Sequence, residues 1–388
     1  VLGGGILALA PFLIWHAEFR QLFWFGDDLF LIDLMSLSGL RTWSLQLFSE
    51  NFVPLFKFLW GGSILLFGGS YAAMLWLMWL THAVNTFFFG RLLLRAGFPL
   101  LAVLVAQLLF GLSPTNLESL GWSVQWSSLL ATGFLLQALW WHEAHREPPK
   151  LFSARLLLPL FFLVAASALS FSRGVLTGAV ISLGLMLPAL WSWRAREFVR
   201  SIPGALICLL PAVATGLVIL KFAYGNQNDM AGHWGEAAAF SASYFLFNPG
   251  HLIFGDTSLQ LSALVGIGAI KIGVIIAALM IARGRVFHVL LLFLAFDLGS
   301  AILVGVGRFH TGYLLALISR YQYSSLIASL PFLALLLSTL VERLPSIHQR
   351  RWVAIAGLVF IVGWSLARWP VRLKSFTTER GTEMRALI

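Results

Sequence analysis

The chain has 388 residues, of which 59% are hydrophobic and 11% are charged, and its mean hydropathy is +0.87. This composition excludes a protein whose surface faces only water, and it indicates a polytopic membrane protein. A net charge of +10 would suit nucleic acid, but the basic residues are dispersed among short turns, which argues against a nucleic-acid partner. The single cysteine, Cys208, excludes a disulfide framework and a cysteine metal site.

Apolar runs that could cross a membrane as helices recur along the whole sequence. The first run, which ends at Trp15, is short for a span. We interpret it as a helix whose beginning is missing from this chain, with a signal segment as the alternative. With it, the pattern predicts an all-α transmembrane bundle of about eleven spans that forms one domain over residues 1–388. The other ten spans are expected at Ser70–Gly90, Phe98–Leu112, Leu120–Trp141, Leu156–Phe171, Val175–Trp193, Ile202–Ala223, Leu259–Ala282, Val286–Val306, Tyr323–Val341 and Trp352–Ala367.

Three segments outside these spans are longer than a tight turn. Residues 16–70 mix apolar and polar positions irregularly, which predicts short helices lying along the membrane interface. Residues 225–258 contain no Lys or Arg but several aromatic residues, which favours a functional loop over a disordered one. Residues 369–388 carry both signs of charge and are expected as a C-terminal tail on the outer side.

The basic residues define the two sides of the membrane. Alternate connections hold 13 of the 26 lysines and arginines, and by the positive-inside rule these connections are cytoplasmic. The opposite connections hold most of the acids and face the outside. The cytoplasmic set consists of Arg91, Arg95, Arg146, Lys150, Arg155, Arg194, Arg196, Arg200, Arg283, Arg285, Arg343, Arg350 and Arg351.

Lys271 and Asp297 lie inside apolar runs, where an unpaired charge is costly. Lys271 precedes Arg283 by 12 residues and Asp297 follows Arg285 by 12, so both lie about 18 Å from the cytoplasmic turn on neighbouring antiparallel helices. The spacing predicts a buried ion pair between them, with a structural role as its simplest interpretation. His82 and Asn85, one turn apart, similarly predict hydrogen bonds between helices.

The remaining polar residues come from five outer connections that a bundle can bring to one cavity. Asp27 and Asp28 stand among aromatic residues, where partial desolvation and mutual repulsion raise a carboxyl pKa and suit a general base. Arg173, Arg308 and Arg320 suit a phosphate, because a guanidinium binds it bidentately.

Simpler interpretations remain open for the same residues. One aspartate can cap the interfacial helix that starts near Leu29, and each arginine can extend to lipid headgroups. No cofactor is required by the pattern. A divalent cation is a candidate ligand for the outer acids together with Glu118, His233 and His251, although the two histidines do not form a local metal motif.

The arrangement resembles the GT-C superfamily of polytopic glycosyltransferases that use polyprenyl-phosphate donors. In that superfamily the first helix is followed by a long outer loop with an acidic pair near its start, and here "FGDDLF" follows the opening span. Further short stretches similar to bacterial members of uncertain substrate are "SENFVPLFKFLW", "HAVNTFFFGRLLLR", "ESLGWSVQW", "SFSRG" and "SRYQYSS". Two features differ from the pattern: no soluble domain follows the last span in this chain, and the first loop has no Asp-x-Asp motif.

The resemblance implies roles for individual residues. Asp27 or Asp28 would deprotonate the acceptor hydroxyl, with Asp27 ranked first because it matches the leading residue of the acidic pair. Arg308, Arg320 or Arg173 would bind the donor phosphate, and Glu118 would assist the acceptor or a metal. The expected partners are a polyprenyl-phosphate-linked sugar and membrane lipids, and the expected location is a bacterial inner membrane with the active site facing outside.

Two other functions compete with the transferase hypothesis. One is a non-catalytic membrane subunit that keeps the scaffold and packs against other membrane subunits in a larger complex; the aromatic surface would suit it. The other is a transporter or lipid flippase. The scarcity of charges within the spans and the lack of an internal repeat argue against that alternative.

Overall fold

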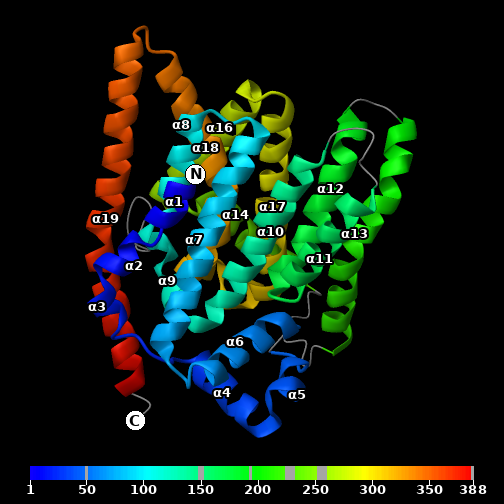
Figure 1. Cartoon of the computed structure of the whole chain (residues 1–388), viewed down its shortest axis with the longest axis vertical. Helices are drawn as coiled ribbons and strands as arrows, with labels where there is room; N and C mark the ends of the chain where they lie inside the picture. Colours follow the sequence, from blue (N-terminus) through cyan, green and yellow to red (C-terminus); the bar gives the residue numbers. More distant parts are fainter. Residues whose placement is uncertain (49–50, 147–152, 192–194, 223–231, 251–259, 386–388) are drawn as a thin grey trace.

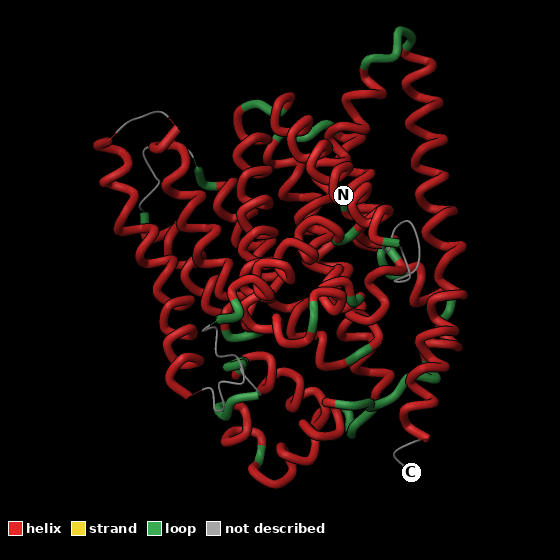
Figure 2. The backbone as a smooth tube through the Cα atoms, turned by 180° about the vertical axis from the view of Figure 1, so that it is seen from behind, coloured by secondary structure: helices red, strands yellow, loops and turns green. Residues whose placement is uncertain are grey.

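The computed structural model describes residues 1–48, 51–146, 153–191, 195–222, 232–250 and 260–385, and the side chains of 381–385 are not described. Within these ranges the fold is helical and contains no sheet, which confirms the predicted all-α class (Figure 2). The main bundle consists of α7 (Tyr71–Ala96), α8 (Leu100–Gly111), α10 (Trp126–Ala144), α11 (Ala154–Ala168), α12 (Val175–Trp191), α13 (Ala195–Phe222), α14 (Trp234–Phe247), α16 (Leu261–Ile281), α17 (Gly284–Arg308), α18 (Gln322–Glu342) and α19 (Ile347–Arg385).

Each of the ten predicted spans after the first overlaps a helix of this bundle. In the described part of the chain, seven helices are long and apolar enough to cross a membrane, and an eighth span results if α8 and the bent segment Pro114–Gly121 count as one. The opening run instead forms the short helices α1 (Leu2–Leu7) and α2 (Ala10–Ile14). The chain is therefore an integral membrane protein, and the count of about eleven spans remains a prediction.

Local sequence signals explain where a span such as α7 begins and ends. The Ser70 hydroxyl accepts a hydrogen bond from the Ala73 N–H at 3.4 Å, so it caps the first turn. Gly97 ends the helix in the left-handed region at φ +90°, a conformation that disfavours residues with a Cβ. Between them, Trp79 is fully buried against Phe12, Phe19 and Trp369, which joins the first helices and α19 to the bundle.

A layer of short helices covers the lower end of the bundle in Figure 1. It comprises α4 (Asp27–Ser38), α5 (Leu40–Ser44) and α6 (Pro54–Leu66), while α3 (His16–Phe19) lies beside α19; these four are the short helices expected for residues 16–70. The loop expected at 225–258 contains a helix, α14, whose Phe240 and Tyr244 are buried against α17 and the segment Tyr313–Leu317. The expected tail from 369 continues α19 as helix to Arg385.

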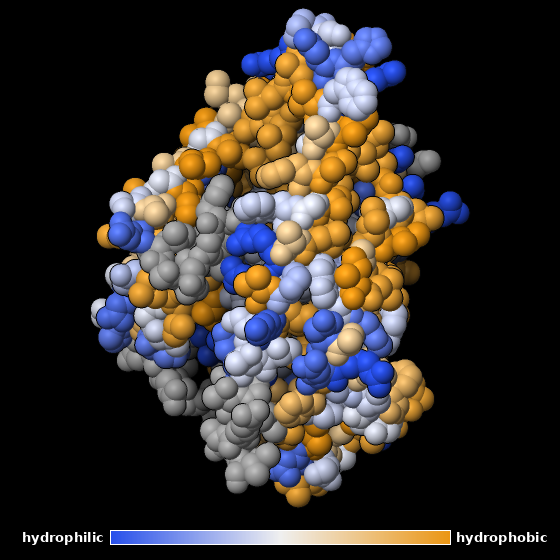
Figure 3. Space-filling view, turned by 90° about the vertical axis from the view of Figure 1, so that its left-hand side faces the viewer, coloured by the Kyte–Doolittle hydropathy of each residue, from blue (hydrophilic) through white to orange (hydrophobic). Residues whose placement is uncertain are grey.

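The helix ends agree with the predicted sidedness. The turns after α7, α16 and α18, which carry arginines of the cytoplasmic set, lie at the upper end of the bundle, opposite the layer of α4 to α6 (Figure 1). Figure 3 shows the face that carries α19: hydrophobic residues cover most of its upper half beneath a hydrophilic tip, and its lower half is mixed. An apolar band between two polar ends is the surface that a bilayer requires.

The ion pair predicted between α16 and α17 is confirmed. Lys271 Nζ lies 2.6 Å from Asp297 Oδ2, and both side chains are buried. Lys271 also donates to the carbonyl oxygens of Phe245 at 2.6 Å and Asn248 at 2.8 Å. The lysine thus satisfies three acceptors and fixes the C-terminal end of α14, a contact that the sequence did not predict.

The hydrogen bonds expected from His82 and Asn85 are confirmed as well. The ring nitrogens of His82 lie 3.0 Å from the Tyr323 hydroxyl and 3.1 Å from the Gly111 carbonyl oxygen. Asn85 donates to the same Tyr323 hydroxyl at 2.9 Å and to the Leu129 carbonyl at 2.8 Å. These groups connect α7, α8, α10 and α18 through buried hydrogen bonds.

Candidate functional site

The two adjacent aspartates at the start of α4 have different surroundings. Asp27 is exposed, whereas Asp28 is 0% exposed. The Asp28 carboxylate accepts three hydrogen bonds: from the Ser123 hydroxyl at 2.6 Å and the Val124 N–H at 3.2 Å on one oxygen, and from the Phe25 N–H at 3.2 Å on the other. Asp28 therefore fixes the residue that enters its own helix, Phe25, and also fastens the helix to a second segment; it does not cap the helix, whose N-cap is Gly26. Of the two predicted candidates for a general base, Asp28 is thus enclosed and Asp27 is open to solvent.

Burial changes the acidity of Asp28. Desolvation raises its pKa from 3.8 to about 7, and the negative charge of Asp27 adds to the increase. The three hydrogen bonds favour the carboxylate and oppose this increase, but they do not cancel it. Near neutral pH, Asp28 is thus close to equally divided between its charged and neutral forms.

The partner of Asp28 is a break in the helical bundle. The sequence predicted a continuous span from Leu120, but the helix α9 (Leu117–Gly121) ends there, the 3-10 turn η2 (Ser123–Gln125) follows, and α10 begins only at Trp126. This prediction was wrong because the apolar and aromatic stretch "GWSVQW" carries no Pro or charge to indicate a break. The break frees the Val124 N–H for Asp28.

One hydrogen bond from a tryptophan and one from a tyrosine hold this break in position. Trp60 of α6 donates from its indole N–H to the Ser123 hydroxyl at 2.9 Å, and Ser123 donates onward to Asp28. The Tyr71 hydroxyl, at the start of α7, donates to the Gly121 carbonyl at 2.7 Å. The joint between α4 and η2 is accordingly supported by α6 and α7 and excludes water from Asp28.

An aromatic pair next to the joint carries two arginines. The rings of Phe25 and Trp122 meet edge to face with centroids 5.6 Å apart. The Arg380 guanidinium, from the outer end of α19, lies 3.5 Å from the Phe25 centroid and 5.1 Å from that of Trp122, and the Arg320 guanidinium lies 5.8 Å from Trp122. We call Phe25, Trp122, Arg320 and Arg380 the arginine platform. It places two positive charges beside the residues that precede Asp27.

A pocket of about 200 Å³ opens beside the arginine platform. Its lining combines the Arg380 guanidinium and the polar groups of Gln21 and Thr377 with apolar surface from residues 22, 23 and 25 and the backbone of Gly121. A cationic end next to apolar walls is suited to an amphipathic anion, such as a phosphate with a hydrocarbon chain.

Glu118 has a structural role that differs from the predicted one. Its carboxylate accepts hydrogen bonds from the Ser319 hydroxyl and from the backbone N–H of Arg320, the latter at 2.9 Å. It thereby fixes the turn η6 (Ser319–Tyr321), which presents Arg320 to Trp122. Both bonds end on the same oxygen, Oε2, and the direct role of Glu118 toward acceptor or metal stays a prediction.

Two other predicted residues lie in a second group. Arg308 ends α17 next to Phe309, whose ring stacks on His233 with centroids 5.4 Å apart. His233 is in turn 3.0 Å from Glu236 on the exposed first turn of α14. No contact described in the structure joins this second group to Asp27 or Asp28, and a cavity shared by all of them stays a prediction. His251, the remaining candidate, lies outside the described residues.

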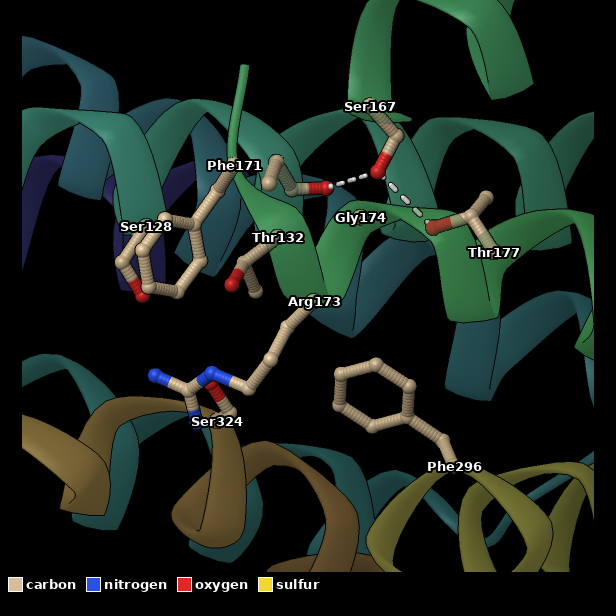
Figure 4. A pocket seen from close by; sticks show the side chains of 10 residues that line it. Ser128, Thr132, Ser167, Phe171, Arg173, Gly174, Thr177, Phe296 and Ser324 are labelled. Carbon is tan, nitrogen blue, oxygen red and sulfur yellow. Dashed lines mark hydrogen bonds between the residues drawn. The ribbon is translucent and has the colours of Figure 1, made fainter. Parts of the chain in front are cut away.

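Arg173 lies deeper, at a third place. It is 5% exposed and donates to the Tyr244 hydroxyl at 3.3 Å, in a cavity of about 10 Å³ between α10, α11, α17 and α18 (Figure 4). Its turn, η3 (Ser172–Gly174), packs so closely on α11 that a Cβ on Gly174 would lie 1.9 Å from the Ser167 carbonyl oxygen. A cavity of this size does not hold a phosphate, so we withdraw Arg173 from the predicted phosphate-binding set.

The described residues form no metal site, and no relative was found among known proteins. Among the described residues, no group of three or more His, Cys, Asp or Glu side chains could hold a metal ion. No protein-family model matches the sequence and no curated protein is similar to it. The arrangement of the residues is therefore the only basis for inferring a function.

Proposed function

We propose that this protein is a membrane glycosyltransferase of the GT-C type, which moves a sugar from a polyprenyl-phosphate donor to an acceptor on the extracytoplasmic side. One observation carries the proposal: a buried, triply hydrogen-bonded Asp28 fixes the helix turn that presents the exposed Asp27 beside the arginine platform. A carboxylate next to paired guanidiniums at a membrane surface provides a base for the acceptor and a cationic site for the donor.

Asp27 is the catalytic base in this proposal and Asp28 is the positioning residue. A general base must come within hydrogen-bond reach of the proton it removes, which suits the exposed Asp27 but not the enclosed Asp28. The backbone at Gly26, with φ +54°, turns the chain into α4 so that both aspartates stand in its first turn.

The donor phosphate would bind to Arg320 and Arg380, with the lipid chain against Leu22, Phe23 and Phe25 in the 200 Å³ pocket. The acceptor hydroxyl gives its proton to Asp27 as its oxygen forms a bond to the anomeric carbon of the sugar. The bond between that carbon and the phosphate oxygen breaks, and polyprenyl phosphate leaves with the electron pair. The two guanidiniums stabilise the charge that develops on the leaving oxygen.

A comparison of Asp27→Asn with Asp28→Asn tests these roles. The purified protein would be incubated with a panel of polyprenyl-phosphate sugars, and release of polyprenyl phosphate would be measured. We expect Asp27→Asn to lower kcat by a factor of about 10² to 10⁴ at an unchanged unfolding temperature, since it removes the base and no internal contact. Asp27→Glu, which keeps a carboxylate, should recover part of the rate.

Asp28→Asn should instead lower thermal stability. An amide can replace only one of the two accepting oxygens, so one N–H donor loses its partner. Full turnover by Asp27→Asn would contradict the assignment of the base. Unchanged stability of Asp28→Asn would contradict the positioning role.

A further inference from the structure

Arg320 of the arginine platform is a half-buried cation without an ionic partner in the described structure. Among the residues that the structure describes, no carboxylate lies within ion-pair distance of its guanidinium. The guanidinium carbon instead lies 5.8 Å from the centroid of the Trp122 ring and 5.9 Å from that of Tyr321. These rings attract the guanidinium without neutralising it, so its charge remains available to an anion.

Glu118 contacts the turn that carries Arg320, but it binds the backbone and not the guanidinium. Its oxygen Oε2 accepts one hydrogen bond from the Ser319 hydroxyl and another from the backbone N–H of Arg320 at 2.9 Å. Both donors belong to η6, whereas Glu118 lies on α9, 201 residues before Ser319 in the chain. Hydrogen bonds to a carboxylate are stronger than those between neutral groups. The acid therefore holds the backbone of Arg320 without using its positive charge.

One short stretch of chain contacts Arg320 at both ends. Glu118, which holds the backbone, precedes Trp122, which contacts the guanidinium, by four residues. The other side of the turn is held by α14, whose Tyr244 hydroxyl donates to the Tyr321 carbonyl at 3.5 Å. A long side chain loses rotamer freedom when it binds a ligand, and fixing its position beforehand reduces that cost. Arg320 is thus preorganised for an anion.

We propose that Glu118 is a positioning residue for the donor phosphate and acts through Arg320. The inference rests on the proposed function, in which Arg320 and Arg380 bind that phosphate. Its sign is opposite to that of a simple electrostatic effect. A carboxylate repels an anion, so removal of the Glu118 charge alone would strengthen phosphate binding. Loss of its two hydrogen bonds releases the turn that carries Arg320 and weakens phosphate binding instead.

Two substitutions of Glu118 separate these effects. Glu118→Gln removes the charge but keeps an amide oxygen, and because both bonds end on one oxygen, that amide oxygen can accept both. Glu118→Leu has a similar size and removes the charge and the acceptor together. We expect Glu118→Leu to weaken phosphate binding about tenfold, as the loss of a hydrogen bond to a charged group does. Glu118→Gln should bind phosphate nearly as tightly as the wild type.

Equilibrium binding to the full chain in detergent measures the effect. The probes are geranyl phosphate and geraniol, which share a hydrocarbon chain and differ in the phosphate. Glu118→Leu should weaken binding of the phosphate and leave that of the alcohol unchanged, because Glu118 does not line the pocket. Arg320→Gln should show the same selective loss. The double variant Glu118→Leu with Arg320→Gln should bind the phosphate no more weakly than Arg320→Gln alone.

Glu379→Gln is the matched control. Glu379 is an exposed acid that directly precedes Arg380, and its carboxylate accepts a hydrogen bond from the Ser375 hydroxyl of the same helix at 3.0 Å. The substitution removes the same charge as Glu118→Gln but leaves η6 intact. Phosphate binding by Glu379→Gln should therefore be unchanged or stronger.

The outcomes distinguish this inference from the proposed function. If the wild type bound geranyl phosphate no more tightly than geraniol, the donor site itself would be wrong, and the role of Glu118 with it. If Arg320→Gln lost phosphate affinity but Glu118→Leu did not, Arg320 would keep its role and only the inference about Glu118 would be overturned. Equal losses for the phosphate and the alcohol in Glu118→Leu would overturn it as well, since they indicate general damage to the pocket.

Discussion

Asp28 and Asp297 are both buried carboxylates, yet they are compensated in opposite ways. Asp297, in the centre of the bundle, has a lysine 2.6 Å away. Asp28, at the outer end, has a serine hydroxyl and two backbone N–H groups, and no cation within ion-pair distance in the described structure. A charged partner stabilises the carboxylate strongly, whereas neutral donors leave the cost of desolvation uncancelled.

The difference bears on what each residue can contribute. A carboxylate with an ionic partner holds two helices together through charge as well as through a hydrogen bond. A carboxyl group with only neutral donors is sensitive to pH near neutrality, because its pKa is about 7. The bundle centre is therefore joined by an ion pair and the joint at Asp28 by neutral donors, a contrast that four measurements can test.

The largest effect is expected from Lys271→Met. This change leaves the Asp297 carboxylate buried without a cation and leaves two backbone carbonyls without a donor, which should cost about 3–5 kcal/mol of stability. Thermal unfolding in detergent would measure the loss. The double variant Lys271→Met with Asp297→Leu should regain most of it. A double variant no more stable than Lys271→Met would show that the pairing is not what the lysine contributes.

The second-largest effect is expected in the pH dependence of stability, which depends on Asp28. The folded pKa of Asp28 is about 7 and its ordinary value is 3.8, so the folded state binds more protons between these values. Folding stability should consequently fall as the pH rises from about 4 to 7, by on the order of 4 kcal/mol. In Asp28→Asn this slope should be absent, while Asp27→Asn should keep it. A wild-type unfolding temperature that does not change over this window would contradict the raised pKa.

A smaller loss is expected when the joint at Asp28 loses its hydroxyl donor. Ser123→Ala leaves the two backbone N–H donors in place but removes the partner of the Trp60 indole, so the loss should be about 1–3 kcal/mol. Ser182→Ala, which removes a buried serine bonded only to a backbone carbonyl of α13, is the matched control and should lose less. A loss from Ser123→Ala as large as that from Lys271→Met would remove the contrast between the two sites.

The smallest change is expected at Lys57, a buried lysine of α6. It donates to the Gln46 carbonyl at 3.1 Å and lies 4.4 Å from the centroid of the Trp43 ring. Burial lowers its pKa from 10.5 to about 8, so its charged form destabilises the fold below that pH and stability rises with pH between 8 and 10.5. Lys57→Met should raise stability at pH 7 by about 1 kcal/mol and give no gain at pH 10. A gain that is the same at both pH values would contradict this interpretation.

The features that the sequence predicted well depend on local patterns. Apolar runs located the helices because hydropathy is a property of consecutive residues. The Lys271–Asp297 pair could be predicted because both residues lie 12 residues from the arginines of the turn that joins their helices. A helix rises by a constant amount per residue, so both side chains lie at the same depth. The position of α14 within the expected outer loop was missed, because its packing depends on helices far away in the sequence.

The candidate site was predicted only in part, for a related reason. Neighbouring residues of a helix point about 100° apart, so a pattern that selects Asp27 and Asp28 cannot say which one faces inward. That choice depends on η2, some 95 residues away, whose break has no sequence signal. Arg380 was overlooked because the segment after Trp369 was expected as a tail. An apolar residue at Phe376, one turn before Arg380, was the available indication that this helix continues to pack.

The continuity of α19 has a mechanical consequence. Its 39 residues span about 58 Å, roughly twice the thickness of a hydrocarbon core, and connect the turn after α18 to Arg380. Near its middle, the fully buried Trp369 donates to the Leu112 carbonyl at 2.9 Å. Beyond that point the helix is held again by the buried Leu373 and Phe376 and by Arg380 on the Phe25 ring, whereas its first half is largely exposed. A displacement of the exposed half would therefore reach the arginine platform only through the stretch of helix around Pro370, where the backbone lacks one hydrogen-bond donor.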